Sequence, residues 1–213
     1  MARPRFEKMD PARQEGILAA AAEEFASRGF EGASLNRIVE RASASKGALY
    51  YYFEDKADLL ATVAHRAVQR VLAEVHIPPL ASLTHEDFWE QVREVSRRSF
   101  GSLEADTWYI RLMRAFWRLR EEEAARRATA GVMDWSRDLI RAFFQRGQEL
   151  GAVRTDLPLD LMLEMFLAAD EAGDRWMMEH WDGLGERERA ELLDARLDFA
   201  RDMLDARHMG WEP

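Results

Sequence analysis

The segment Ser34–Phe53, with the sequence SLNRIVERASASKGALYYYF, constrains the fold of this chain more than any other. It has the pattern of two short helices joined by a tight turn, and the second helix carries small, basic and tyrosine side chains in place of an apolar stripe. Because helices below about 12–15 residues are marginal in water, both must be held by neighbouring helices. The face of the second helix that is left unpacked is suited to insertion into the major groove of DNA.

The whole sequence predicts an all-α fold of about nine helices. Apolar residues recur at helical spacing, and no segment alternates with the period of two that a half-buried strand requires. Asp10 and Pro11 mark a helix start, and Gly29 is suited to end that helix. Pro78 and Pro79 must end the long helix that precedes them. The expected helices span about residues 10–29, 34–41, 45–52, 55–76, 84–99, 106–120, 121–150, 158–181 and 186–209.

Charge and composition divide the chain into two parts. The formal net charge is -9, yet residues 1–56 hold equal numbers of basic and acidic side chains, so the excess of acid lies in the remainder. We therefore expect a DNA-binding domain at residues 1–56 and a ligand-binding and dimerisation domain at residues 57–213. The chain has no cysteine, no secretory signal and no apolar run of the roughly 18 residues that span a bilayer, which favours a cytoplasmic location away from membranes.

The second short helix and its N-terminus carry the chemistry that DNA recognition needs. Ser45 can cap the helix, and together with Lys46 it lies where the helix dipole and unpaired N–H groups favour a phosphate. Gly47 has no side chain, so the backbone can approach DNA closely. Tyr50 and Tyr51 present hydroxyl groups that can donate hydrogen bonds to DNA. The alternative for these two tyrosines is burial in the protein core.

Two further basic residues lie near this helix in the sequence. Lys56 is in the first turn of the next helix and Arg37 lies on the first short helix, so both are candidates for phosphate contact. The alternative for these residues, and for Lys46, is a solvated charge. Tyr52 and Phe53 are expected to be core residues, because the short helix needs an apolar end that seats it on its neighbours.

The order of residues from Gly29 to Leu60 resembles the N-terminal signature of the TetR family of bacterial transcriptional regulators. The resemblance covers about residues 10–62, and its matching positions are Gly29, Phe30, Ala33, Ser34, Leu35, Ile38, Val39, Ala42, Ala44, Ser45, Lys46, Gly47, Ala48, Leu49, Tyr50, Tyr52, Phe53, Lys56, Leu59 and Leu60. It implies a homodimer in which a three-helix head binds DNA and variable C-terminal helices enclose a small-molecule pocket. Carried over by position, the DNA-facing residues are Ser45, Lys46, Gly47, Ala48, Tyr50, Tyr51 and Lys56.

Four positions depart from the family pattern. Arg37 stands where the family usually has an acidic residue, which removes a capping partner for Ser34 and adds a candidate phosphate contact. Ser43 replaces the usual turn glycine, and Tyr51 stands where histidine is common. Ala48 replaces a usual threonine, so a hydroxyl contact is lost and an apolar contact with a thymine methyl group becomes available. DNA binding is still expected, but the operator sequence is left open.

The C-terminal part is rich in aromatic and methionine side chains. Such residues either form a dense helical core or line a pocket for a hydrophobic or aromatic ligand, because methionine adapts its shape and aromatic rings form flat walls. The segment Gly147–Asp156 resembles the one that opens the family's two dimerising helices, so we expect helices 158–181 and 186–209 to pair with their copies. The candidate ligand-binding residues are Trp108, Met113, Phe116, Trp117, Trp135, Phe143 and Met165.

The motifs of common enzymes are missing from the sequence, including a glycine-rich phosphate loop, a Gly-x-Ser-x-Gly elbow and a His-Glu-x-x-His metal site. We therefore expect no enzyme activity, catalytic residue, metal or cofactor. The prediction is a ligand-responsive regulator, a repressor released from a palindromic double-stranded operator when a small hydrophobic or aromatic molecule shifts the helix 55–76. The alternative, favoured by the net charge and the lost threonine, is a helical dimeric adaptor that binds a small molecule or a protein and does not read DNA.

Overall fold

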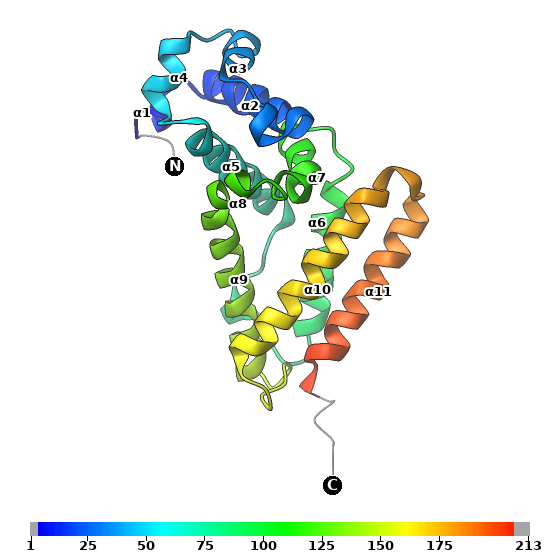
Figure 1. Cartoon of the computed structure of the whole chain (residues 1–213). Helices are drawn as coiled ribbons and strands as arrows, with labels where there is room; N and C mark the ends of the chain where they lie inside the picture. Colours follow the sequence, from blue (N-terminus) through cyan, green and yellow to red (C-terminus); the bar gives the residue numbers. More distant parts are fainter. Residues whose placement is uncertain (1–3, 207–213) are drawn as a thin grey trace. The chain divides into compact units, whose positions relative to one another are not determined.

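The computed structural model describes residues 4–206 (Figure 1). Its elements divide into two compact units. The first unit runs to Glu74 and includes Ser102–Asp134, whereas the second contains Val75–Gly101 and continues from Trp135. Between residues 4 and 206 the regular structure is helical throughout and no β-strand occurs. The predicted all-α class is therefore confirmed.

The described residues form eleven α-helices, compared with about nine expected. The helices of the first unit are α1 (Pro4–Glu7), α2 (Pro11–Gly32), α3 (Leu35–Arg41), α4 (Lys46–Tyr52), α5 (Lys56–Val75), α7 (Trp108–Leu119) and α8 (Glu123–Ala128). Those of the second are α6 (Phe88–Ser102), α10 (Leu159–His180) and α11 (Glu186–Leu204), with the short 3-10 helices η1 (Leu80–Ser82) and η2 (Trp181–Gly183). The helix α9 (Ala130–Glu149) begins in the first unit and continues in the second.

Helix α2 is central to the first unit. Its start is the predicted one, since the Asp10 carboxylate accepts a hydrogen bond from the N–H of Arg13 at 3.1 Å. The helix is interrupted at Gly29, whose φ of 72° lies in the left-handed region that favours glycine, and a last stretch ends at Gly32. Its apolar side, with Phe25 fully buried, belongs to one core that also contains residues of α3, α4, α5 and α7.

Helix α7 packs along α2 and shares this core. Leu112 is fully buried between the two helices' apolar faces. At one end of α7 the indole N–H of Trp108 donates to Glu15 at 2.6 Å, and at the other Arg118 donates to the carbonyl of Ala26 at 2.7 Å. Helix α7, although distant in sequence, is therefore fastened to the helix that supports α3 and α4.

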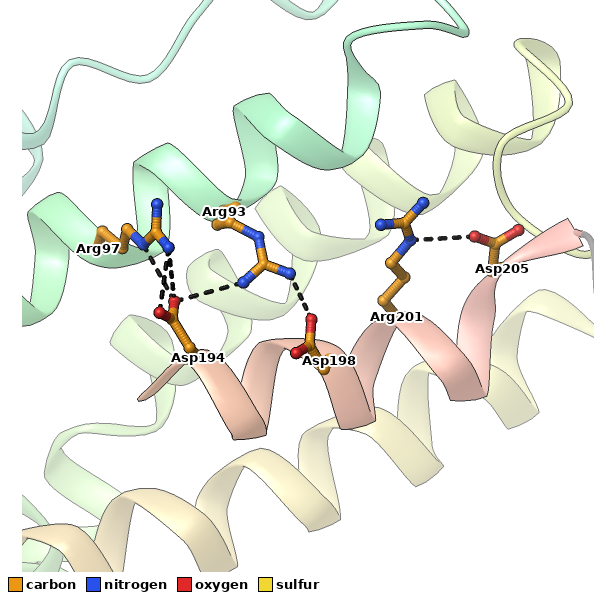
Figure 2. Close-up of polar contacts among 6 residues, drawn as sticks. All are labelled: Arg93, Arg97, Asp194, Asp198, Arg201 and Asp205. Carbon is orange, nitrogen blue, oxygen red and sulfur yellow. Dashed lines mark hydrogen bonds and ion pairs between the residues drawn. The ribbon is translucent and has the colours of Figure 1, made fainter. Parts of the chain in front are cut away.

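In the second unit, a row of ion pairs joins α6 to α11 (Figure 2). Arg97 donates from Nε and Nη2 to the two oxygens of Asp194, at 3.0 and 3.1 Å. Arg93 donates to the same carboxylate at 3.3 Å and also pairs with Asp198. The two arginines and the two aspartates are each one helical turn apart, so the charged side chains of the two helices match in spacing.

Helices α10 and α11 lie side by side as an antiparallel pair (Figure 1). Arg196 of α11 donates to Asp174 at 2.8 Å and to Asp170 at 3.0 Å. At Gly173 a Cβ atom would come within 2.7 Å of Arg196 Nε, so glycine makes room for this guanidinium. Desolvation between the helices and the charge of Asp174 raise the pKa of Asp170 to about 7, although Arg196 opposes the shift.

An exposed apolar stripe runs along α10. Leu161, Met165 and Trp176 are 47%, 44% and 45% exposed, and Ala168 and Ala172 between them are exposed as well. Spacings of three and four residues put all five side chains on one face of the helix. The second unit therefore presents to its surroundings apolar side chains of the kind that usually pack inside a protein.

Two predicted helix boundaries are wrong. The helix expected over 121–150 is divided into α8 and α9 at Thr129, whose hydroxyl donates to the carbonyl of Ala125 at 2.9 Å and accepts from Arg120 at 3.0 Å. A threonine that bonds its own backbone competes with a continuous helix. The last helix ends at Leu204 rather than near 209, and the end of that prediction lies outside the described residues.

Candidate DNA-binding surface

Helices α3 and α4 form a helix-turn-helix with the turn at residues 42–45. Ser43, which stands in place of a turn glycine, has a φ of 50°, so the turn requires the left-handed conformation that glycine adopts most readily. Ser45 caps α4 as predicted, because its hydroxyl accepts a hydrogen bond from the N–H of Ala48 at 3.1 Å. The start of α4 is thus determined by residues within the turn itself.

One face of α4 is anchored in the core of the first unit and the other is open. Leu49 and Phe53 are each 2% exposed and Tyr52 is half-buried, which confirms the core prediction for Phe53 and Tyr52. Tyr50 and Tyr51 are both 47% exposed, so burial in the core is excluded for these two side chains. A short helix held in this way presents its tyrosines on a rigid support.

The other predicted contact residues of α4 lie at its N-terminal end. Lys46 is the first residue of the helix, Ser45 and Gly47 are exposed, and Ala48 is half-buried. Apart from its two chain neighbours and the nearby backbone of α4 itself, no heavy atom that the structure describes lies within 4 Å of the position a Cβ of Gly47 would take. The structure therefore brings these residues onto one short helix with the exposed tyrosines, while their contact with DNA stays a prediction.

Arg37 forms hydrogen bonds within the N-terminal head, which comprises helices α2, α3 and α4. Its Nε donates to Oε1 of Glu24 at 2.7 Å, and its Nη2 donates to the carbonyl of Gly32 at 2.7 Å. The carboxylate of Glu24, which is 2% exposed, also accepts the N–H of Ser34 at 3.0 Å. Burial opposes ionisation of Glu24, but the hydrogen bonds from Arg37 and Ser34 outweigh it and lower the pKa of this carboxyl. Phosphate contact by Arg37 stays a prediction beside this observed role.

Ser34 does not cap α3 with its side chain. Ser34 occupies the N-cap position, but its side chain makes no capping hydrogen bond, and the carboxylate of Glu24 accepts its N–H instead. Sequence reasoning missed Glu24, although it falls seven residues after Ile17 and therefore on the apolar face of α2. A carboxylate on such a face needs partners, and Arg37 supplies one.

Lys56 faces the junction between α2 and α3. Its Nζ donates to the carbonyls of Glu31 at 3.2 Å and Ala33 at 3.3 Å, and it lies 4.6 Å from the ring centre of Phe30. An ammonium group has three donors, so these contacts use most of its hydrogen-bonding capacity within the head. Phosphate contact by Lys56 stays a prediction that depends on the remaining donor.

Glu122, in the connection between α7 and α8, holds the same junction. Its carboxylate accepts the N–H of Phe30 at 2.8 Å and that of Glu31 at 2.6 Å. A Cβ at Gly29 would lie 2.3 Å from Oε1 of Glu122, so glycine is needed both for the positive φ and for this approach. No local pattern in the sequence could predict this contact, because Glu122 lies in a charged segment with several similar side chains.

Four of the candidate ligand-binding residues belong to the first unit. Trp108 and Met113 belong to its main apolar cluster, one buried and the other packed against it. Phe116 and Trp117 belong to a smaller cluster, with their ring centres 5.6 Å apart. These side chains all have partners within the helical core, and a role in ligand binding stays a prediction.

The other three candidates belong to the second unit. Phe143 packs at the edge of an apolar cluster that includes Phe88 and Leu163. Trp135 and Met165 are 40% and 44% exposed. Their role in ligand binding also stays a prediction.

Residues 4–206 contain no candidate metal site and no candidate membrane span. No three carboxylate or histidine side chains gather there as metal ligands would, and no helix there is long and apolar enough to cross a bilayer. The surfaces that stand out are the exposed tyrosines of α4 and the apolar stripe of α10.

Comparisons with known proteins agree with this geometry. The family model described as bacterial regulatory proteins of the tetR family matches residues 17–63. The HTH-type transcriptional repressor AcnR of Corynebacterium diphtheriae is 27% identical over 150 residues, which cover 70% of this chain and 73% of that protein. FadR of Bacillus subtilis, solved in complex with stearoyl-CoA, has a TM-score of 0.70 at 15% identity, covering 88% of this chain and 97% of that one. SmeT, the repressor of the Stenotrophomonas maltophilia multidrug efflux pump SmeDEF, has a TM-score of 0.67 at 22% identity, and the match covers 90% of this chain and 89% of SmeT.

The matched residues include α3, α4, most of α2 and the start of α5, which are the elements that build the helix-turn-helix. The likeness to the two solved structures extends the shared fold over most of the chain. The N-terminal part of this chain is similar to the TetR family of bacterial regulatory proteins, and the resemblance seen in the sequence is confirmed.

Proposed function

We propose that this protein is a ligand-responsive, DNA-binding transcriptional repressor that acts as a homodimer. The match of residues 17–63 to the tetR family model supports the regulatory class, and the relative AcnR is itself named as a transcriptional repressor. The observation that carries the proposal is the exposure of Tyr50 and Tyr51 on a helix whose opposite face is fixed in the core by Leu49 and Phe53. A helix so held can enter a major groove about 12 Å wide without losing its orientation.

The residues of α4 and its N-cap make different kinds of contact with DNA in this proposal. Ser45 and Lys46 bind a phosphate at the positive end of the helix, and Gly47 allows the backbone to come close. Tyr50 and Tyr51 donate hydrogen bonds from hydroxyl groups to the DNA backbone or to base edges. The DNA-binding domain of this proposal is residues 1–56, and the protein acts in the cytoplasm without enzyme activity.

The proposed dimer uses the apolar stripe of α10. A monomer rarely leaves apolar side chains exposed along one helix face, and a second copy related by a two-fold axis covers them. The same symmetry presents two α4 helices to successive major grooves, about 34–36 Å apart.

The proposed dimer contact is tested by Met165→Asp. This substitution puts a charge into the apolar stripe of α10 and should convert the dimer to a monomer in sedimentation equilibrium. Glu171→Ala, off the stripe on the same helix, should leave the dimer intact; a monomeric wild-type protein would overturn the proposal.

The proposed effector is a small hydrophobic or aromatic molecule bound within residues 57–213, where the aromatic and methionine side chains are concentrated. Helix α5 carries the signal in this proposal, because Leu59 and Leu60 at its start are buried in the core of the head. A displacement of α5 changes the separation of the two α4 helices, so that both no longer fit their grooves. The structural relative FadR was solved with stearoyl-CoA, so the fold can accept an apolar chain in that protein.

The test is selection of a binding sequence from a randomised duplex library by the full chain, followed by titration of the selected duplex at several salt concentrations. We expect a palindromic sequence and a binding constant whose logarithm falls linearly with the logarithm of salt concentration. Lys46→Ala should weaken binding and flatten that slope. Failure to enrich any sequence would overturn the proposal and favour an adaptor that does not read DNA.

A further inference from the structure

The short helix α1 is docked against the recognition helix α4. Phe6 is fully buried, with its ring centre 4.9 Å from that of Phe53 and 5.9 Å from that of Tyr52. Both partners lie at the C-terminal end of α4, and a buried aromatic ring is among the strongest apolar anchors available to a short segment. Helix α1 is therefore part of the folded head.

Polar contacts fix the position of α1 further. The side-chain amide of Gln14 donates to the carbonyls of Phe6 and Met9, both at 2.9 Å, which satisfies backbone acceptors at the end of the short helix. Glu7, the acidic residue of α1, pairs with Arg66 of α5. Its charge is therefore compensated by another helix and not by the neighbouring Arg5.

This docking holds Arg5 beside an exposed tyrosine of α4. The guanidinium carbon of Arg5 lies 4.7 Å from the ring centre of Tyr51, and both side chains are exposed. Among the residues that the structure describes, no carboxylate forms an ion pair with Arg5. A guanidinium stacked on an aromatic face keeps the N–H groups in its plane available to an oxyanion.

We propose that Arg5 is a further DNA-contacting residue, which binds a backbone phosphate beside the groove that α4 enters. This inference rests on the proposed DNA-binding function. Arg5 lies on α1, at the flank of α4, and contacts outside the recognition helix go mostly to phosphates, with which a guanidinium forms charge-assisted hydrogen bonds. Because Phe6 and Tyr51 hold the segment in place before DNA binds, little conformational freedom is lost on contact.

The experiment measures the affinity of the full chain for the duplex selected by the wild-type protein, over a series of salt concentrations. Arg5→Ala should bind roughly tenfold more weakly and should lower the salt slope by about 1 for each protomer. Arg5→Lys keeps the charge and should keep most of the slope. Arg127→Ala removes the same charge from α8, where the side chain is 70% exposed and paired with Glu123, and should change neither quantity.

The outcomes separate this inference from the proposed function. If the wild-type protein binds the duplex and Arg5→Ala binds it equally well with the same slope, only the inference is overturned. Weaker binding with an unchanged slope would mean that Arg5 acts solely by orienting Tyr51, which also overturns it. If the wild-type protein selects no sequence, the proposed function fails and this inference with it. Tyr51→Phe keeps the ring beneath Arg5, so the effect of Arg5→Ala on the slope should persist in that background.

Discussion

The first unit seats α1, α2 and α4 on fully buried phenylalanine rings, whereas the second leaves apolar faces of α10 and α11 exposed and joins α6 to α11 through a row of ion pairs. Phe6, Phe25 and Phe53 are at most 2% exposed in the first unit. In the second unit Trp176 and Phe199 are 45% and 63% exposed, while arginines of α6 pair with aspartates of α11 (Figure 2). The difference indicates that the second unit, unlike the core of the first, leaves an apolar helix face uncovered by its own chain, and this is the face that the proposed dimer uses.

Two carboxyl groups illustrate the same difference. Glu24 in the first unit is buried but accepts hydrogen bonds from Arg37 and Ser34, and its pKa is lowered. Asp170 in the second unit shares one arginine with Asp174, and desolvation together with that neighbouring charge raises its pKa to about 7. A carboxylate with its own hydrogen-bond donors is held in the ionised form, whereas one that shares an arginine with a second carboxylate is not.

The largest expected change in the free energy of unfolding is that of Phe25→Ala. It removes a fully buried ring and should lower the free energy of unfolding by about 3–5 kcal/mol in urea titrations. The matched control is Phe199→Ala, which removes the same ring from an exposed position and should change the free energy of unfolding by less than about 0.5 kcal/mol when the chain is monomeric. Similar losses for the two variants would contradict the contrast between the units.

The next largest effect is expected for Glu24→Ala, which should lower the free energy of unfolding by about 1–3 kcal/mol near neutral pH. The reason is that the N–H of Ser34 and the guanidinium of Arg37 lose their acceptor. The lowered pKa of Glu24 means that its contribution is complete above its ordinary value of 4.5 and is lost as the pH falls through the native pKa. Glu24→Gln keeps an acceptor but has no charge, so its stability should depend less on acid. An identical acid dependence in the Gln variant and the wild type would contradict this role of Glu24.

The contribution of Asp170 to stability should have the opposite pH dependence to that of Glu24, and Asp170→Asn tests it. Since the pKa of Asp170 is raised, the native state retains a proton at a pH where the unfolded chain has released it. The stability that this proton contributes is complete below pH 3.8, the ordinary pKa, and is lost as the pH rises through about 7. The variant should therefore gain stability relative to the wild type as the pH rises from about 4 to about 8 in thermal unfolding. Glu171→Gln, the next residue on α10, is the control and should run parallel to the wild type. A parallel curve for Asp170→Asn as well would show that this carboxyl group is not perturbed.

The smallest expected effect is that of Arg187→Ala. This side chain is 90% exposed and pairs with Glu191 one turn along α11 at 2.7 Å. Exposed pairs of this kind contribute about 0.3–0.5 kcal/mol, and salt screens them. The loss should be measurable in thermal unfolding at low salt and absent at high salt; a loss above about 1 kcal/mol would mean that exposed ion pairs matter more in this unit than we propose.

The local features of the head were predictable from the sequence because they depend on neighbouring residues. The caps at Asp10 and Ser45 and the helix break at Gly29 follow from residue type and spacing, whereas the exposure of Tyr50 and Tyr51 was one of two alternatives that the sequence left open. The caps and the break involve interactions within a turn or two of the chain, where helical periodicity and capping preferences act.

The tertiary partners of charged residues were not predictable. The sequence allows Arg37 and Lys56 to be phosphate ligands or solvated charges, and only the fold shows that both form hydrogen bonds within the protein. Glu122 comes from a charged segment far along the chain and is brought to Phe30 by the packing of α7 on α2. Aromatic residues such as Trp108 pose the same difficulty, because a helical core and a ligand pocket use the same composition.

The most direct test of the central claim, that two α4 helices of a dimer read DNA, is hydroxyl-radical footprinting of the full chain on the selected duplex. We expect two protected segments related by a two-fold axis, with centres about one helical turn (34–36 Å) or a multiple of it apart. No protection, or a single protected segment without two-fold symmetry, would contradict it.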